Sequence, residues 1–125
     1  MWSIPKFLCF ADYYSNTLFK FDIKSNGTER IESPALNLKC HKTVQVFDDL
    51  YTVSSYPLAI FKYENITQWT GKTALVKHHL AEADHDRLHF ALSNYKNRAL
   101  YITGGITDSC TKSAVVYNLS SDKFT

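Results

Sequence analysis

Short runs of β-branched and aromatic residues recur along the whole chain, and clusters of Asn, Asp, Ser and Gly separate them. This combination is typical of β-strands joined by tight turns. We expect a connecting loop, with at most one helical turn, in the charged stretch at residues 77–87. The pattern therefore predicts an all-β fold, with strands at residues 7–11, 18–23, 28–31, 43–47, 50–54, 58–63, 68–70, 88–93, 99–103 and 114–119.

The chain also contains an internal sequence repeat. The segment at residues 100–124 aligns with residues 50–69, and that segment aligns in turn with residues 7–31. The best-preserved positions are a glycine pair, Gly104 and Gly105, and two aromatic positions that follow it. The glycine pair aligns with Ser54-Ser55 and with Phe10-Ala11, Tyr117 with Tyr63 and Phe21, and Phe124 with Trp69.

A further strand precedes each of the last two copies, so each unit is expected to hold four strands, here called a to d. The first unit lacks strand a, and the last unit ends as strand d begins. The approximate units are residues 1–37, 38–84 and 85–125. Four short antiparallel strands in a repeat of this length are typical of one blade of a β-propeller.

On these residues the chain resembles the kelch-repeat family. The glycine pair Gly104-Gly105 after strand b, Tyr117 (Tyr63) in strand c and Phe124 (Trp69) opening strand d carry the resemblance. It implies an all-β, partial kelch-type β-propeller of about three four-stranded blades. Glycine after strand b avoids a Cβ clash in a crowded turn, and large rings suit the packing between blades.

Three blades are too few to close a ring, because closed propellers hold 4–8. Each repeat contacts only its neighbours, so the two end blades are expected to expose apolar surface. Additional blades, or self-association with a second copy, would cover that surface. Two copies would supply about six blades.

Composition narrows the function. A length of 125 residues suits one ordinary domain, and a net charge of +2 is too weak to indicate nucleic acid or an anionic membrane as the main partner. No apolar run approaches the roughly 20 residues of a membrane span, and the first residues make a poor signal peptide. Three widely spaced cysteines indicate reduced thiols. We therefore expect a cytoplasmic protein.

Three Asn-X-Ser/Thr triplets, at Asn26, Asn65 and Asn118, fall at the same place in the alignment, between strands c and d. Asn, Ser and Thr side chains bond to nearby backbone in turns, so we interpret these triplets as turn chemistry. N-glycosylation stays open as the alternative.

Catalytic chemistry has little support. The stretch "HHLAEADHDRLH" holds His85 and His89 four residues apart among carboxylates, a set that zinc accepts on a helix. However, His89 falls where a strand is expected, so we favour a solvated d–a loop. No nucleophile elbow or phosphate-binding loop occurs. We predict no enzyme activity, no metal and no cofactor; a metal-dependent or sugar-acting enzyme remains the alternative.

The resemblance implies a function in protein binding. Kelch propellers mostly act as protein-binding scaffolds, in cytoskeletal assemblies or as substrate receptors of ubiquitin ligases. A purely structural subunit of a larger assembly is the other alternative. Because neighbouring strands alternate in direction, the b–c and d–a loops share one side of the molecule. The predicted partner-binding residues on these loops are Tyr13, Tyr14, Tyr56, His85, Asp108 and Lys112.

Overall fold

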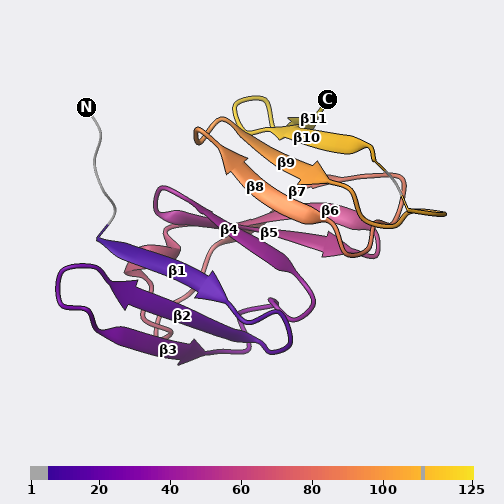
Figure 1. Ribbon diagram of the computed structural model, residues 1–125. Helices are drawn as coiled ribbons and strands as arrows, with labels where there is room; N and C mark the ends of the chain where they lie inside the picture. Colours follow the sequence, from indigo (N-terminus) through magenta and orange to yellow (C-terminus); the bar gives the residue numbers. More distant parts are fainter. Residues whose placement is uncertain (1–5, 111) are drawn as a thin grey trace.

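The computed structural model describes residues 6–110 and 112–125, and these residues form an all-β fold of three antiparallel sheets, none of them closed (Figure 1). Neighbouring strands in each sheet are also consecutive in the chain. Sheet 1 contains β1 (Phe7–Ala11), β2 (Thr17–Asp22) and β3 (Thr28–Glu32). Sheet 2 contains β4 (Lys42–Val46), β5 (Asp49–Ser55), β6 (Leu58–Tyr63) and β7 (Lys77–Glu82). Sheet 3 contains β8 (Ala91–Tyr95), β9 (Ala99–Thr103), β10 (Ala114–Asn118) and β11 (Lys123–Phe124).

The sheets lie in succession, with sheet 2 between the other two (Figure 1). Their first strands are neighbours, since β1 contacts β4 and β4 contacts β8. The strands of the three sheets fall within residues 1–37, 38–84 and 85–125 respectively. The all-β prediction is thus confirmed. No helix among the described residues is long and apolar enough to cross a membrane.

Alternation of side chains along the strands gives sheet 2 two apolar faces, and each face packs against a neighbouring sheet. Leu50 and Tyr63 of sheet 2 share one core with Leu18 and Ile31 of sheet 1. A second core joins the opposite face of sheet 2 to sheet 3. Its members are Val46, Tyr51, Val53, Leu58, Ile60, Phe90, Leu100, Ile102 and Tyr117. The aromatic positions Tyr63 and Tyr117 therefore each pack onto the preceding sheet, as expected.

The last strand of sheet 2 is not where the sequence indicated. Residues 66–68 form a 3-10 helix, η1 (Ile66–Gln68), and the outer strand is β7, in the stretch that we expected to be a loop. An edge strand pairs on one side only and tolerates exposed polar side chains. For this reason the charged sequence of β7 did not look like a strand, and the prediction of a loop was wrong. Trp69 is 5% exposed and packs in the core between sheets 1 and 2, but it opens no strand.

Strand β8 starts at Ala91, later than the expected residue 88. Leu88 instead forms an isolated bridge with Ile106, with two backbone hydrogen bonds of 2.8 Å. Phe124 does lie in the fourth strand of its sheet. It is opposite Tyr117, and the two rings meet edge to face at 5.5 Å between centroids.

The pairing register relates the three sheets to one another. In each sheet one aromatic ring lies opposite a leucine on the preceding strand. The pairs are Leu8 with Phe21, Leu50 with Tyr63 and Leu100 with Tyr117. Counted from these leucines, the position of Gly104 is taken by Ser54 in sheet 2 and by Asp12 in sheet 1. The sequence alignment placed Phe10 there, because it matched apolar runs without knowing which residues pair.

The three cysteines are free and differ in exposure, which gives a testable prediction. Cys9 is buried, and burial raises the pKa of its thiol to about 11, although the nearby Lys20 opposes this shift. Since the thiolate is the nucleophile, we expect two thiols, Cys40 and Cys110, to react with an aromatic disulfide reagent at pH 8. Cys9 should react at least about a hundredfold more slowly. Three equally fast thiols in the native protein would contradict this packing; unfolding in guanidinium provides the count of three.

Candidate functional site

The loops that follow β1, β5 and β9 lie at the same end of the molecule, to the right in Figure 1. The connections β3–β4 and β7–β8 reach the same end. Backbone hydrogen bonds join neighbouring loops: Cys40 N donates to Tyr13 O at 2.7 Å, and Leu58 N donates to His85 O at 3.0 Å. We call this surface the loop face. It comprises residues 12–16, 33–41, 56–57, 83–90, 104–110 and 112–113.

Exposed tyrosines stand out on the loop face. Tyr14 is 80% exposed and Tyr56 is 70% exposed. Tyr13 is half-buried; its ring meets that of Tyr14 edge to face at 5.2 Å, and Lys42 Nζ lies 5.3 Å from its centroid. Tyr13 is thus held in place by its neighbours, whereas Tyr14 and Tyr56 present their rings to solvent. Exposed tyrosines of this kind are common anchors in protein interfaces.

The three polar candidates also lie on the loop face, but they do not form one cluster with each other. Asp108 and Lys112 are exposed in the loop between β9 and β10. His85 is partly buried in the β7–β8 connection, where its Nδ1 lies 3.3 Å from Asp84 Oδ1. No hydrogen bond or ion pair among the described residues joins any of the three to another. Together with the tyrosines they form a broad surface with separate contact points.

An open pocket of about 320 Å³ lies where the first strands of the three sheets meet the loop face. Tyr13 lines it on one side. His41 lines it as well; burial, and to a lesser degree the positive charge of Lys77, lower the pKa of this imidazole and so favour its neutral form. The remaining lining residues are Ala11, Lys42, Thr43, Ala91 and Leu92. The pocket thus joins all three sheets at one point.

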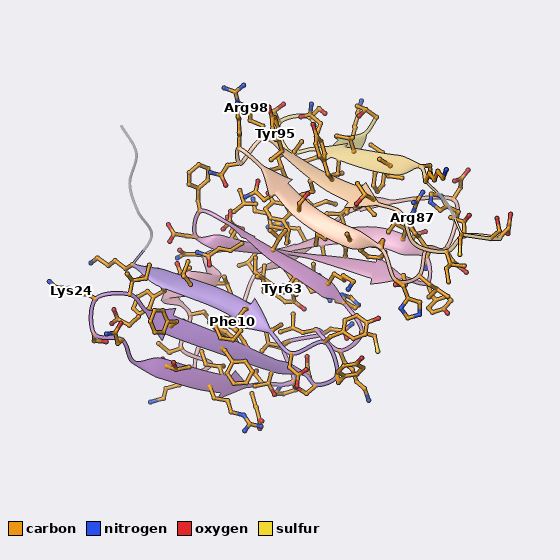
Figure 2. All side chains as sticks on the ribbon, viewed as in Figure 1. Phe10, Lys24, Tyr63, Arg87, Tyr95 and Arg98 are labelled. Atoms are coloured by element: carbon orange, nitrogen blue, oxygen red, sulfur yellow. The ribbon has the colours of Figure 1, made fainter. Side chains whose placement is uncertain are left out.

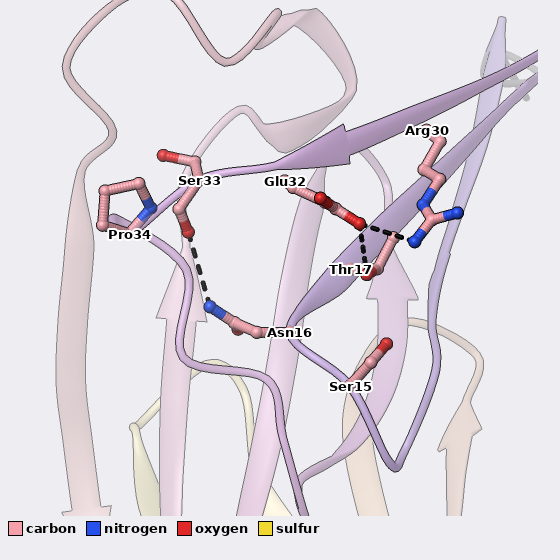
Figure 3. Close-up of a pocket in the computed structure, with 7 residues that line it drawn as sticks. All are labelled: Ser15, Asn16, Thr17, Arg30, Glu32, Ser33 and Pro34. Carbon is pink, nitrogen blue, oxygen red and sulfur yellow. Dashed lines mark hydrogen bonds and ion pairs between the residues drawn. The ribbon is translucent and has the colours of Figure 1, made fainter.

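A second pocket, of about 490 Å³, lies at the loop-face end of sheet 1 (Figure 3). Its polar groups satisfy one another. Arg30 and Glu32 form an ion pair at 2.6 Å, and Asn16 Nδ2 donates to Ser33 O at 3.4 Å. Because its two charges neutralise each other, this pocket offers no fixed charge to a ligand.

Sequence reasoning missed Arg87, which organises the loop face. Its side chain is buried, and Nη1 donates to Gly104 O at 2.8 Å while Nη2 donates to Ser113 Oγ at 3.1 Å. Its backbone N donates to Ser55 O at 3.1 Å. Arg87 therefore ties the β5–β6 turn to the β9–β10 loop (Figure 2). Nothing in the local sequence distinguishes it from the charged residues around it.

The His-rich stretch is divided between structural elements. His78 and His79 lie on β7, where they pair with Glu64 and Glu82, and His85 lies in the following connection. Across residues 6–110 and 112–125, no three His, Cys, Asp or Glu side chains are close enough to hold a metal ion together.

Comparison with known proteins did not assign a family. No protein-family model matches the chain, and no curated protein matches it significantly.

Proposed function

We propose that the chain is a partial kelch-type β-propeller and acts as a non-enzymatic protein-binding module in the cytoplasm. The observation that carries the proposal is the pair of exposed rings, Tyr14 and Tyr56, on a loop face to which all three sheets contribute. The internal repeat supports the family, because Tyr63 and Tyr117 occupy equivalent, fully buried positions in sheets 2 and 3.

A protein partner suits this surface better than a small molecule. The pocket among the three sheets is open to solvent, and the contact points around it are spread over loops from different sheets. Tyrosine rings supply a large contact area at a low cost in conformational entropy, because binding fixes only two side-chain torsions. The partner therefore contacts Tyr14 and Tyr56 as anchors, with Asp108, Lys112 and His85 at the polar rim.

The test compares two matched variants with the wild type. Quantitative affinity capture first identifies the proteins that bind, and binding assays with each purified captured protein then measure the affinities. Tyr14→Ala/Tyr56→Ala removes both anchors. Phe47→Ala removes another largely exposed ring (61%) from the β4–β5 turn at the opposite end of sheet 2. We expect the double variant to weaken binding of the specific partner by at least about tenfold, and Phe47→Ala to leave it unchanged. Equal binding by wild type and the double variant would contradict the loop face as the binding surface.

A further inference from the structure

The outer face of sheet 1, which points away from sheet 2, is apolar and uncovered. Cys9, Leu18 and Ile31 point inward to the core, so the alternate side chains point outward. The apolar members of the outward set are Leu8, Phe10, Phe19 and Phe21. Leu8 is 45% exposed and Phe10, labelled in Figure 2, is 50% exposed. The Phe10 and Phe19 rings stack at 5.3 Å between centroids. A group of exposed apolar side chains on one sheet face is typical of an interaction surface.

The pairing register shows what kind of surface this is. The outward pair Leu8–Phe21 is equivalent to Leu50–Tyr63 in sheet 2 and to Leu100–Tyr117 in sheet 3. All four side chains of the two later pairs are 0% exposed, because the preceding sheet covers them. The outer face of sheet 1 is therefore a third copy of an interface that the molecule already forms twice. In sheets 2 and 3, the equivalent face is covered by the preceding sheet of the same chain.

Among the described residues, the face of sheet 3 that points away from sheet 2 packs against no other sheet. Leu100, Ile102 and Tyr117 point from sheet 3 toward sheet 2, so the alternate side chains form a rear face. There Tyr95, 45% exposed, stacks on Tyr101 at 5.4 Å and 7° between ring planes, and Val116 lies opposite Tyr101. The rear face of sheet 3 is equivalent to the face of sheet 2 that carries Val53 and Ile60. In sheet 2, this face packs against sheet 3.

We propose that the outer face of sheet 1 binds the rear face of sheet 3 in a second copy of the chain. Both faces are built around aromatic pairs, and Arg30 and Glu32 at the edge of the outer face neutralise each other, so no charge opposes the contact. The contact is head to tail, and two copies make it twice around a two-fold axis. The resulting dimer continues the succession of sheets to six. Its formation does not depend on the proposed protein binding at the loop face.

Sedimentation and light scattering of the full chain at micromolar concentration test the proposal. We expect twice the monomer mass of 14.3 kDa. In a dimer of two identical variants, Phe10→Glu or Tyr101→Glu places one charge in each of the two equivalent interfaces. Each substitution should raise the dimer dissociation constant by at least about tenfold. Tyr14→Glu replaces an exposed ring outside both faces with the same charged side chain and should leave the dimer intact. Circular dichroism establishes that each variant is folded.

Mixing the two disruptive variants separates head-to-tail from face-to-face contact. In the mixture, one interface pairs the unchanged rear face of the Phe10→Glu copy with the unchanged outer face of the Tyr101→Glu copy. A one-to-one heterodimer held by this one unchanged interface should therefore reappear, weaker than the wild-type dimer because its other interface carries both charges. A dimer that Phe10→Glu disrupts and Tyr101→Glu does not would overturn the proposal, since it would indicate contact between two outer faces. A wild-type monomer at these concentrations would overturn it as well.

Discussion

Tyr63→Ala is expected to lower the free energy of unfolding by about 3–5 kcal/mol, the range for truncating a large buried ring. Tyr63 is 0% exposed and packs between sheets 1 and 2 with Leu18, Ile31 and Trp69. Its hydroxyl also accepts a hydrogen bond of 2.8 Å from Asn37 N, in the segment that leads from sheet 1 to sheet 2. Removal of the ring leaves a cavity at the interface that holds these two sheets together, so most of the loss comes from packing.

Tyr63→Phe is the matched control, because it keeps the ring and removes only the hydroxyl. It should cost about 1 kcal/mol, the typical contribution of one such hydrogen bond. Urea unfolding of both variants at one fixed protein concentration gives the comparison, since self-association would make stability concentration-dependent. Similar losses for the two variants would show that the hydroxyl, and not the ring, stabilises the interface.

The sequence predicted most strands because their signals are local. Short runs of β-branched and aromatic residues, separated by clusters of turn-forming residues, were sufficient to locate β1, β5, β6, β9 and β10 to within a residue or two. The asparagine turns are a clear case. Asn26 and Asn65 adopt left-handed φ angles of 60° and 54°, and Asn118 Oδ1 accepts from Ser120 N at 2.9 Å. These are the turn roles that their positions between strands c and d of each unit indicated.

The failures arose where the environment, not the local sequence, decides the structure. β7 is a strand because β6 offers it an unpaired edge, although its own residues are mostly polar. Trp69 looked like a strand residue because it is aromatic, but it is buried by sheet 1, which lies far away in the sequence. Arg87 is fixed by Gly104 and Ser113 in the β9–β10 loop, 17 and 26 residues further along the chain. None of these contacts leaves a signal within a short window of sequence.

For the candidate site as well, the sequence was sufficient to predict where the loops lie, but not how exposed their side chains are. Antiparallel topology was sufficient to predict that the loops carrying Tyr13, Tyr14 and Tyr56 lie at one end of the molecule. Topology did not distinguish Tyr13, which is half-buried against its neighbours, from Tyr14, which is 80% exposed. That difference depends on Lys42 and on the ring contact between the two tyrosines. It is also the reason why the proposed binding test alters Tyr14 and Tyr56 and leaves Tyr13 in place.

Gly105→Ala is expected to lower the free energy of unfolding by about 3 kcal/mol, because it combines backbone strain with a steric clash. Gly105 has a φ of +89°, which side-chain-bearing residues rarely adopt. A Cβ there would overlap the carbonyl oxygen of Leu88 and lie 3.0 Å from Phe90 N. The backbone cannot yield cheaply, since Leu88 and Ile106 hold each other through two hydrogen bonds of 2.8 Å.

Gly27→Ala is the matched control for this substitution. It lies in the β2–β3 turn, its φ is not left-handed, and the nearest atom to an added Cβ is the mobile Ser25 Oγ at 3.3 Å. A loss of well under 1 kcal/mol is expected, and equal losses for the two glycines would contradict the close approach at Gly105. Amide exchange adds a local readout: in Gly105→Ala the Leu88 and Ile106 amides should lose protection, because the bridge between them must open to admit the methyl group. Loss of stability with both amides still protected would locate the damage elsewhere than the loop face.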